Sequence, residues 1–116
     1  MNIKIRIIET KAFSKKITGL LAQHSLLLDD YNALKKDLAV NPEKGDILTG
    51  TGGVRKIRLK SASKGKGGGF RVCYFYYVLT NAIYLLLVFQ KNEQENLSAE
   101  EKMILKKITN KIKGKK

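Results

Sequence analysis

The chain has 116 residues, of which 23 are Lys or Arg and 10 are Asp or Glu, so its formal net charge is +13. This length fits one domain, residues 1–116, with one modest hydrophobic core. A charge of this size favours polyanionic partners and stabilises no fold by itself. A single cysteine, Cys73, excludes an internal disulfide and fits a protein of the reducing cytoplasm.

Two segments bear on targeting and on membranes. Residues 1–11 alternate charged and aliphatic side chains and lack the apolar centre of a signal peptide. Residues 72–89 are long and apolar, but Thr80 and Asn81 interrupt them and β-branched and aromatic residues are frequent. Two strands joined by a turn explain this segment better than a spanning helix, so we expect no membrane partner.

The first 42 residues predict one strand and two helices. Ile3, Ile5 and Ile7 alternate with charged residues, which indicates a half-buried strand. Residues 10–21 and 25–39 carry apolar stripes at helical spacing, and Asn41-Pro42 ends the second helix. The two stripes are Phe13, Ile17, Leu20 and Leu21, then Leu27, Leu28, Tyr31, Leu34 and Leu38.

The remaining residues predict three strands and a last helix. Alternation over 54–60 and the β-rich segments 70–78 and 82–90 indicate the strands. Ser98 and Glu101 have the spacing of a capping box. The apolar side of the last helix is expected to hold Met103, Ile104, Ile108 and Ile112, and the basic tail 111–116 to fray. The order β-α-α-β-β-β-α predicts an α+β fold whose sheet is covered on one face by helices.

The strongest functional signal is a run of cations without any anion. No acidic residue occurs between Asp46 and Glu93, an interval with eight Lys or Arg residues. They are Arg55, Lys56, Arg58, Lys60, Lys64, Lys66, Arg71 and Lys91. Gathered on neighbouring strands, these side chains would neutralise phosphates and release counterions. A solvated strand edge that discourages aggregation is the alternative.

The sequence lacks the residues that a P-loop, a metal site or a reactive thiol would require. The glycine-rich segment 64–69 is not followed by Gly-Lys-Ser/Thr or by a helix, so a flexible hairpin loop is favoured over a P-loop. His24 is the only histidine, which leaves too few soft ligands for a metal site, and Cys73 is expected to be a buried, inert thiol. Alternation places Arg71 with Cys73, Phe75 and Tyr77, and a nearby aromatic ring is a candidate for stacking on bases.

Several motifs together resemble the RelE/ParE toxin superfamily, and most closely its HigB-like branch. They are Gly50-Thr51-Gly52-Gly53-Val54-Arg55-Lys56-Ile57-Arg58, Gly65-Lys66-Gly67-Gly68-Gly69-Phe70-Arg71-Val72-Cys73-Tyr74, Phe89-Gln90-Lys91-Asn92-Glu93, Asn96-Leu97-Ser98 and Glu101-Lys102. The similarity extends from about Asn41 to Lys102. It implies a small curved antiparallel sheet with two N-terminal helices packed on it and a C-terminal helix.

The resemblance also implies a function. Many members are ribosome-dependent endonucleases that cut mRNA in the A site of the 70S ribosome, with no metal or other cofactor. The 2′-hydroxyl of the message attacks the adjacent phosphate, leaving a cyclic phosphate and a 5′-hydroxyl. The implied partners are this mRNA, the ribosome and a cognate antitoxin, expected to be a helix-turn-helix protein through which alone the complex contacts operator DNA. A ParE-like inhibitor of DNA gyrase and a nonenzymatic RNA- or ribosome-binding protein are the alternatives.

By position, the resemblance assigns the catalytic set Lys56, Arg58, Arg71 and Lys91. Arg71 is expected to clamp the transition-state phosphate, because a guanidinium matches two phosphate oxygens. Crowding by neighbouring arginines would favour the neutral, proton-accepting form of Lys56, the candidate base. The expected RNA-binding residues are Arg55, Lys60, Lys64, Lys66 and Tyr74. Some members carry a catalytic Tyr near the last helix, where this chain has Asn96-Leu97-Ser98.

Overall fold

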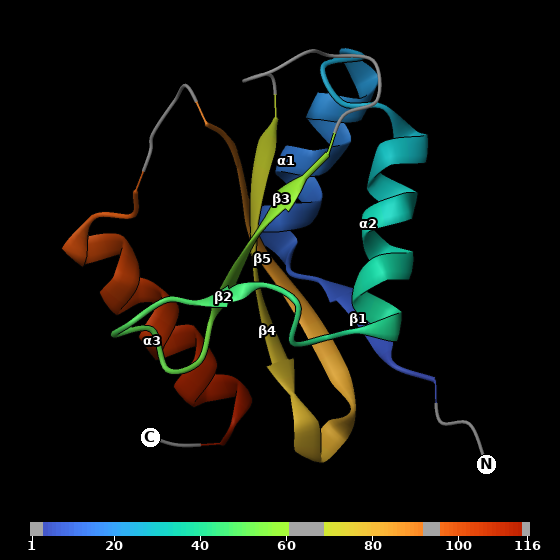
Figure 1. Cartoon of the computed structure of the whole chain (residues 1–116). Coiled ribbons are helices and arrows are strands. Elements are labelled where there is room, and N and C mark those ends of the chain that lie inside the picture. The colour runs from blue at the N-terminus through green and yellow to red at the C-terminus, as the bar shows by residue number, and fades with distance from the viewer. Residues whose placement is uncertain (1–3, 61–68, 92–95, 115–116) are drawn as a thin grey trace.

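The computed structural model describes residues 4–60, 69–91 and 96–114. One five-stranded sheet, in the order β1-β5-β4-β3-β2, lies between helices (Figure 1). The strands are β1 (Arg6–Glu9), β2 (Asp46–Ile47), β3 (Arg55–Leu59), β4 (Phe70–Tyr77) and β5 (Ala82–Gln90). The helices are α1 (Lys11–Ala22), α2 (Leu28–Val40), the short 3₁₀ turn η1 (Val78–Thr80) and α3 (Ala99–Ile112). The predicted α+β class is confirmed.

The sheet is mixed, whereas the resemblance implied an antiparallel one. β1 runs parallel to β5, with Arg6 opposite Ala82 and Glu9 opposite Leu85, and the other pairs are antiparallel. The two-residue strand β2, opposite Lys56 and Arg55, was not predicted from the sequence. Alternating hydrophobicity determines which face of a strand is buried, but it does not determine the neighbouring strand or its direction.

α1 and α2 cover one face of the sheet. Phe13 and Ile17 of α1 and Tyr31 and Leu38 of α2 pack on the inward side chains of β3, β4 and β5. Leu28, predicted to be in the apolar stripe, is 57% exposed, and Leu27 is also exposed. These two residues form the first helical position and the N-cap of α2, so neither lies on the buried stripe of the helix.

The opposite face is covered by α3, so helices lie on both faces and not on one. Ser98 and Glu101 form the predicted capping box. Leu105 is buried against Val54, Cys73 and Phe75, whereas Met103 and Ile104, expected on the apolar side, are exposed. The helix therefore contacts the sheet through a narrower stripe than its hydrophobic residues indicate.

The C-terminal half of α3 is tied to the turn before β3. The Thr109 hydroxyl donates to the Thr51 carbonyl at 3.0 Å, and the Lys113 ammonium donates to the Gly52 carbonyl at 2.8 Å. Gly52 has a φ of +78°, and a Cβ there would lie 2.3 Å from Thr109 Oγ1. This turn therefore requires glycine both for its backbone conformation and for the close approach of α3.

The long apolar segment 72–89 forms the β4–β5 hairpin, as predicted. Asn81 follows η1 with a φ of +52°, a left-handed conformation that asparagine tolerates. Across residues 4–60, 69–91 and 96–114, no helix is long and apolar enough to cross a membrane.

Candidate nucleic-acid interface

The register of β3 and β4 brings two arginines together. Arg58 lies directly opposite Arg71, and Lys56, two residues earlier on β3, lies opposite Cys73. Directly opposed residues share a face in an antiparallel pair, and alternate residues along a strand do so as well. Lys56, Arg58 and Arg71 therefore share the face that α3 partly covers, next to Cys73 and Phe75.

Gly69, the last residue of the glycine-rich segment, lies beneath both arginines. A Cβ at this buried position would lie 3.2 Å from Arg58 Nε and 3.6 Å from Arg71 Nη1. The Gly69 carbonyl also accepts a hydrogen bond from the Lys91 backbone N–H at 3.3 Å. Gly69 thus joins the ends of three strands and lets the two guanidinium groups approach over its Cα.

Lys91 extends the same cationic surface. It comes directly after β5, two residues after Phe89, which lies opposite Arg71, and its backbone N–H bonds Gly69 beneath the two arginines. Arg58 and Lys91 are exposed, and Lys56 and Arg71 are half-buried. We call these four residues the cation cluster. Ion pairs join Lys44 to Asp37 and Arg55 to Glu43, and neither pair involves the cluster.

Arg55 does not join the cation cluster. Its guanidinium donates to the Gly45 carbonyl at 2.7 Å and the Glu43 carbonyl at 3.0 Å, and it pairs with the Glu43 carboxylate. The side chain holds the α2–β2 connection, and alternation places it on the face opposite Lys56. The expected crowding of Lys56 by Arg55 is therefore not found, and the contact of Arg55 with RNA stays a prediction.

Tyr74 was expected to contact RNA, and the structure buries it completely. Its hydroxyl donates to the Pro42 carbonyl at 2.8 Å and accepts from the Gly45 backbone N–H at 2.9 Å. Burial raises the pKa of this phenol, with smaller opposing effects from Gly45 and Arg55. The ring lies in the core beneath α2 and is not available for base stacking.

Cys73 is confirmed as a buried thiol. Burial raises its pKa to about 12, against a smaller lowering effect from the Lys56 ammonium. A thiol with so little thiolate at neutral pH is a poor nucleophile. Lys56 lies directly opposite this thiol in the β3–β4 register, on the same face of the sheet.

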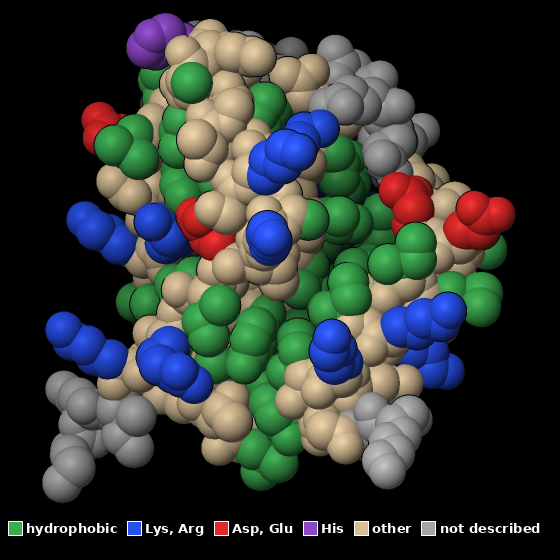
Figure 2. Space-filling model, turned by 180° about the vertical axis from the view of Figure 1, so that it is seen from behind, with side chains coloured by type: hydrophobic (Ala, Val, Ile, Leu, Met, Phe, Trp, Pro, Cys, Tyr) green, Lys and Arg blue, Asp and Glu red, His purple; other side chains and the backbone are tan. Residues whose placement is uncertain are grey.

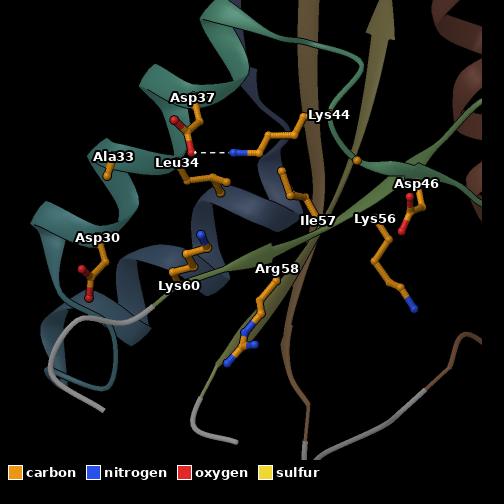
Figure 3. A pocket seen from close by; sticks show the side chains of 11 residues that line it. Asp30, Ala33, Leu34, Asp37, Lys44, Asp46, Lys56, Ile57, Arg58 and Lys60 are labelled. Carbon is orange, nitrogen blue, oxygen red and sulfur yellow. Dashed lines mark hydrogen bonds and ion pairs between the residues drawn. The ribbon is translucent and has the colours of Figure 1, made fainter. Parts of the chain in front are cut away.

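Of the other predicted contacts, only Lys60 lies within the described residues. Lys60 is exposed at the end of β3, and Lys64 and Lys66 lie outside the described residues. Beside Lys60, a cleft of about 290 Å³ runs between α2 and the outer edge of β3. Figure 3 shows Lys56 and Arg58 leaving β3 on the same side, with Asp46 next to Lys56. Neither this cleft nor Asp46 was predicted, because β2, which positions Asp46, is too short for its pattern to be recognised.

A larger groove of about 700 Å³ lies on another part of the surface. It runs between α3 and the β1–β5 edge and is lined mainly by apolar side chains, among them Tyr84, Leu86 and Ile104. Figure 2 shows hydrophobic side chains exposed on the rear surface with Lys and Arg on either side. The groove contains few polar groups, so the cation cluster and its cleft are the better candidate for phosphate chemistry.

The chain is similar to known proteins in both sequence and structure. Residues 5–116 match the family model described as the RelE toxin of the RelE/RelB toxin–antitoxin system. A solved structure of the Escherichia coli toxin RelE, a double arginine-to-alanine mutant in the free state, is similar with a TM-score of 0.54. The two sequences are 18% identical, and the match covers 80% of this chain and 90% of the other.

Proposed function

Since the chain belongs to the RelE toxin family and is thus the toxin of a toxin–antitoxin system, we propose that it cleaves messenger RNA on the ribosome. The observation that carries the proposal is the direct pairing of Arg58 with Arg71 above Gly69. Two guanidinium groups at adjacent positions can bind the oxygens of a single phosphodiester. The cleavage itself follows from the chemistry of RNA.

The 2′-hydroxyl oxygen of one nucleotide attacks its own 3′-phosphorus, and the bond from phosphorus to the next 5′-oxygen breaks. One proton leaves the 2′-hydroxyl and one reaches the 5′-oxygen, so the products are a 2′,3′-cyclic phosphate and a 5′-hydroxyl. Because the nucleophile belongs to the substrate, the protein has to position the phosphate, stabilise its growing negative charge and move protons.

Each member of the cation cluster has a role in this scheme. Arg71, half-buried and opposite Arg58, clamps the equatorial oxygens as negative charge develops. Lys56, opposite Cys73 on the same face, is our candidate for the proton acceptor. The exposed Arg58 and Lys91 hold the phosphate from its open side and assist the leaving oxygen.

Two partners accompany this function. The family implies an antitoxin, and we propose a helix-turn-helix protein that carries the complex to operator DNA. The ribosomal A site is the proposed location of cleavage, as the resemblance to this toxin superfamily implies. The high net charge of +13 supports binding to RNA.

The test is cleavage of a translated message in a cell-free bacterial system, followed by mapping of the new 5′ ends. Arg71→Ala should slow cleavage about 100- to 1000-fold, the usual loss when one transition-state donor is removed. Its far-ultraviolet circular dichroism should be unchanged. Arg6→Ala, a matched substitution on the exposed edge strand β1, should cleave like the wild type.

Two results would overturn the proposal. In the first, the message stays intact with wild-type toxin present, and gyrase no longer supercoils plasmid DNA. The other is full cleavage by Arg71→Ala.

A further inference from the structure

We infer that the cleft between α2 and the outer edge of β3 binds the base of a nucleotide next to the scissile phosphate, and that Asp46 selects bases with an exocyclic amino group. This inference rests on the proposed function and adds a base preference to it. We call this site the base cleft; its lining is Asp30, Ala33, Leu34, Asp37, Lys44, Gly45, Asp46, Lys56, Ile57, Arg58 and Lys60.

The position of the base cleft connects it to the cation cluster. Lys56 and Arg58 contribute to its lining and also belong to the cluster opposite Arg71. Ile57, between them on β3, packs on the other side against the core beneath α2. A nucleotide whose phosphate contacts Arg58 can therefore reach the cleft around a single strand edge (Figure 3).

Size and wall chemistry suit a nucleobase. The volume of about 290 Å³ is at the lower end of the range for small-molecule sites. Ala33, Leu34 and Ile57 supply apolar walls for the flat faces of a base, and charged side chains stand at the rim. This combination of apolar walls with a few polar groups is typical of sites that orient a flat ligand.

The carboxylates decide which part of a nucleotide enters the cleft. Asp30 and Asp46 disfavour a phosphate beside them, whereas Lys56, Arg58 and Lys60 attract it along the strand edge, so we place the backbone at these cations and the base inside the cleft. Asp37 pairs with Lys44 at 3.1 Å. In the described part of the chain, these carboxylates belong to no group of three ligands that could hold a metal ion.

Asp46 is the carboxylate nearest to the proposed chemistry. It lies on β2 directly opposite Lys56, and it is exposed at the mouth of the cleft. An ionised carboxylate only accepts hydrogen bonds. Cytosine, adenine and guanine offer amino donors on their Watson–Crick edges, whereas uracil offers one N–H between two carbonyl oxygens that a carboxylate repels.

The inference is tested without ribosomes by titrating the ¹⁵N-labelled wild-type protein with cytidine 3′-monophosphate and, separately, uridine 3′-monophosphate. We expect cytidine 3′-monophosphate to bind about tenfold more tightly, the effect of one hydrogen bond to a charged group. The amide signals of Ala33, Gly45 and Ile57 should shift. In Asp46→Asn the preference should disappear, because an amide both donates and accepts. Asp29→Asn makes the same change on α2 outside the lining and should keep the preference.

Three results would overturn the inference: equal binding of the two nucleotides by the wild type, shifts confined to residues outside the base cleft, or an equal loss of both affinities in Asp46→Asn. The last would make Asp46 a positioning residue for Lys56. Failure of the proposed function has a different signature, because nucleotide preference would persist while the message stayed intact on ribosomes. If both proposals hold, Asp46→Asn should cleave message at uridine-containing codons that the wild type leaves uncut.

Discussion

Tyr74 supports the interface without touching a ligand. Its buried hydroxyl bonds both the Pro42 carbonyl and the Gly45 backbone N–H, and so holds the connection that leads from α2 into β2. Gly45 fits this contact closely, since a Cβ there would lie 2.9 Å from Tyr74 Cε1. Because β2 positions Asp46 opposite Lys56, a core tyrosine indirectly determines the geometry of the base cleft.

Tyr74→Phe should therefore destabilise the fold. The substitution leaves a buried N–H and a carbonyl without a partner, which costs about 1–3 kcal/mol in the free energy of unfolding. Urea denaturation followed by circular dichroism would measure the loss. Tyr77→Phe, a change on a half-buried ring of the same strand, is the comparison. An unchanged unfolding free energy in Tyr74→Phe would show that these hydrogen bonds contribute nothing net.

The same tyrosine predicts a response to alkaline pH. Burial raises the pKa of Tyr74 above the ordinary value of about 10 for tyrosine, and burial together with the Glu9 carboxylate raises the pKa of Tyr31. A group whose pKa is higher in the folded state contributes its full stability below the pKa of the unfolded chain. That contribution should fall as pH rises above about 10, because the unfolded chain then releases protons that the fold retains.

Urea midpoints measured between about pH 8 and pH 11 should decline, and the decline should be shallower in Tyr74→Phe. A steeper decline in the variant, or a midpoint that rises with pH, would contradict this account.

At the scale of elements, α3 packs on the sheet through Leu105, and its C-terminal half is bonded to the turn before β3. Gly50 and Gly52 both have positive φ, +82° and +78°, but only Gly52 is in close contact with Thr109. Gly50→Ala should thus cost about 1 kcal/mol for its backbone alone. Gly52→Ala should cost clearly more, since its Cβ collides with the Thr109 hydroxyl.

Thermal melts of the two variants would isolate the contact, because both substitutions carry the same backbone penalty. We expect Gly52→Ala to expose hydrophobic surface beneath α3, detected by increased binding of an anilinonaphthalene dye. Equal melting temperatures for the two variants would mean that α3 tolerates displacement from the turn.

Elements were the easiest level to predict from the sequence. The capping box, the hairpin around Asn81 and the strands carrying Arg58 and Arg71 follow from local patterns, and the structure contains them. Strand alternation alone already places Arg55 on the face opposite Lys56. Counting the cations in this segment did not take that alternation into account. The partner of β1, the strand β2 and the approach of Gly69 to two guanidinium groups depend on contacts distant in sequence, which no local pattern encodes.

At the scale of the whole molecule, the charge of +13 predicts a strong dependence of RNA binding on salt. If the interface contacts about five phosphates of a single strand, affinity should fall roughly a hundredfold for a fourfold rise in salt. Fluorescence anisotropy with a short labelled RNA would measure the slope of log affinity against log salt concentration.

Variants locate the phosphate contacts. Arg58→Gln should reduce the slope by about the amount that one phosphate contact contributes, because Arg58 is an exposed member of the cation cluster. Lys15→Gln removes an exposed charge from α1, on the opposite face of the sheet, and should leave the slope unchanged. A larger effect of Lys15→Gln would place the RNA on the face that α1 and α2 cover.

The pairing of β1 with β5 has a consequence for synthesis of the toxin. The Thr10 hydroxyl, just after β1, donates to the Leu85 carbonyl, 75 residues further along the chain. As the nascent polypeptide grows from its N-terminus, β1 has no strand to pair with until β5 has been translated. The sheet that supports Arg71 therefore cannot close until β5 has emerged from the ribosome, and the proposed RNA-binding face forms only after that point.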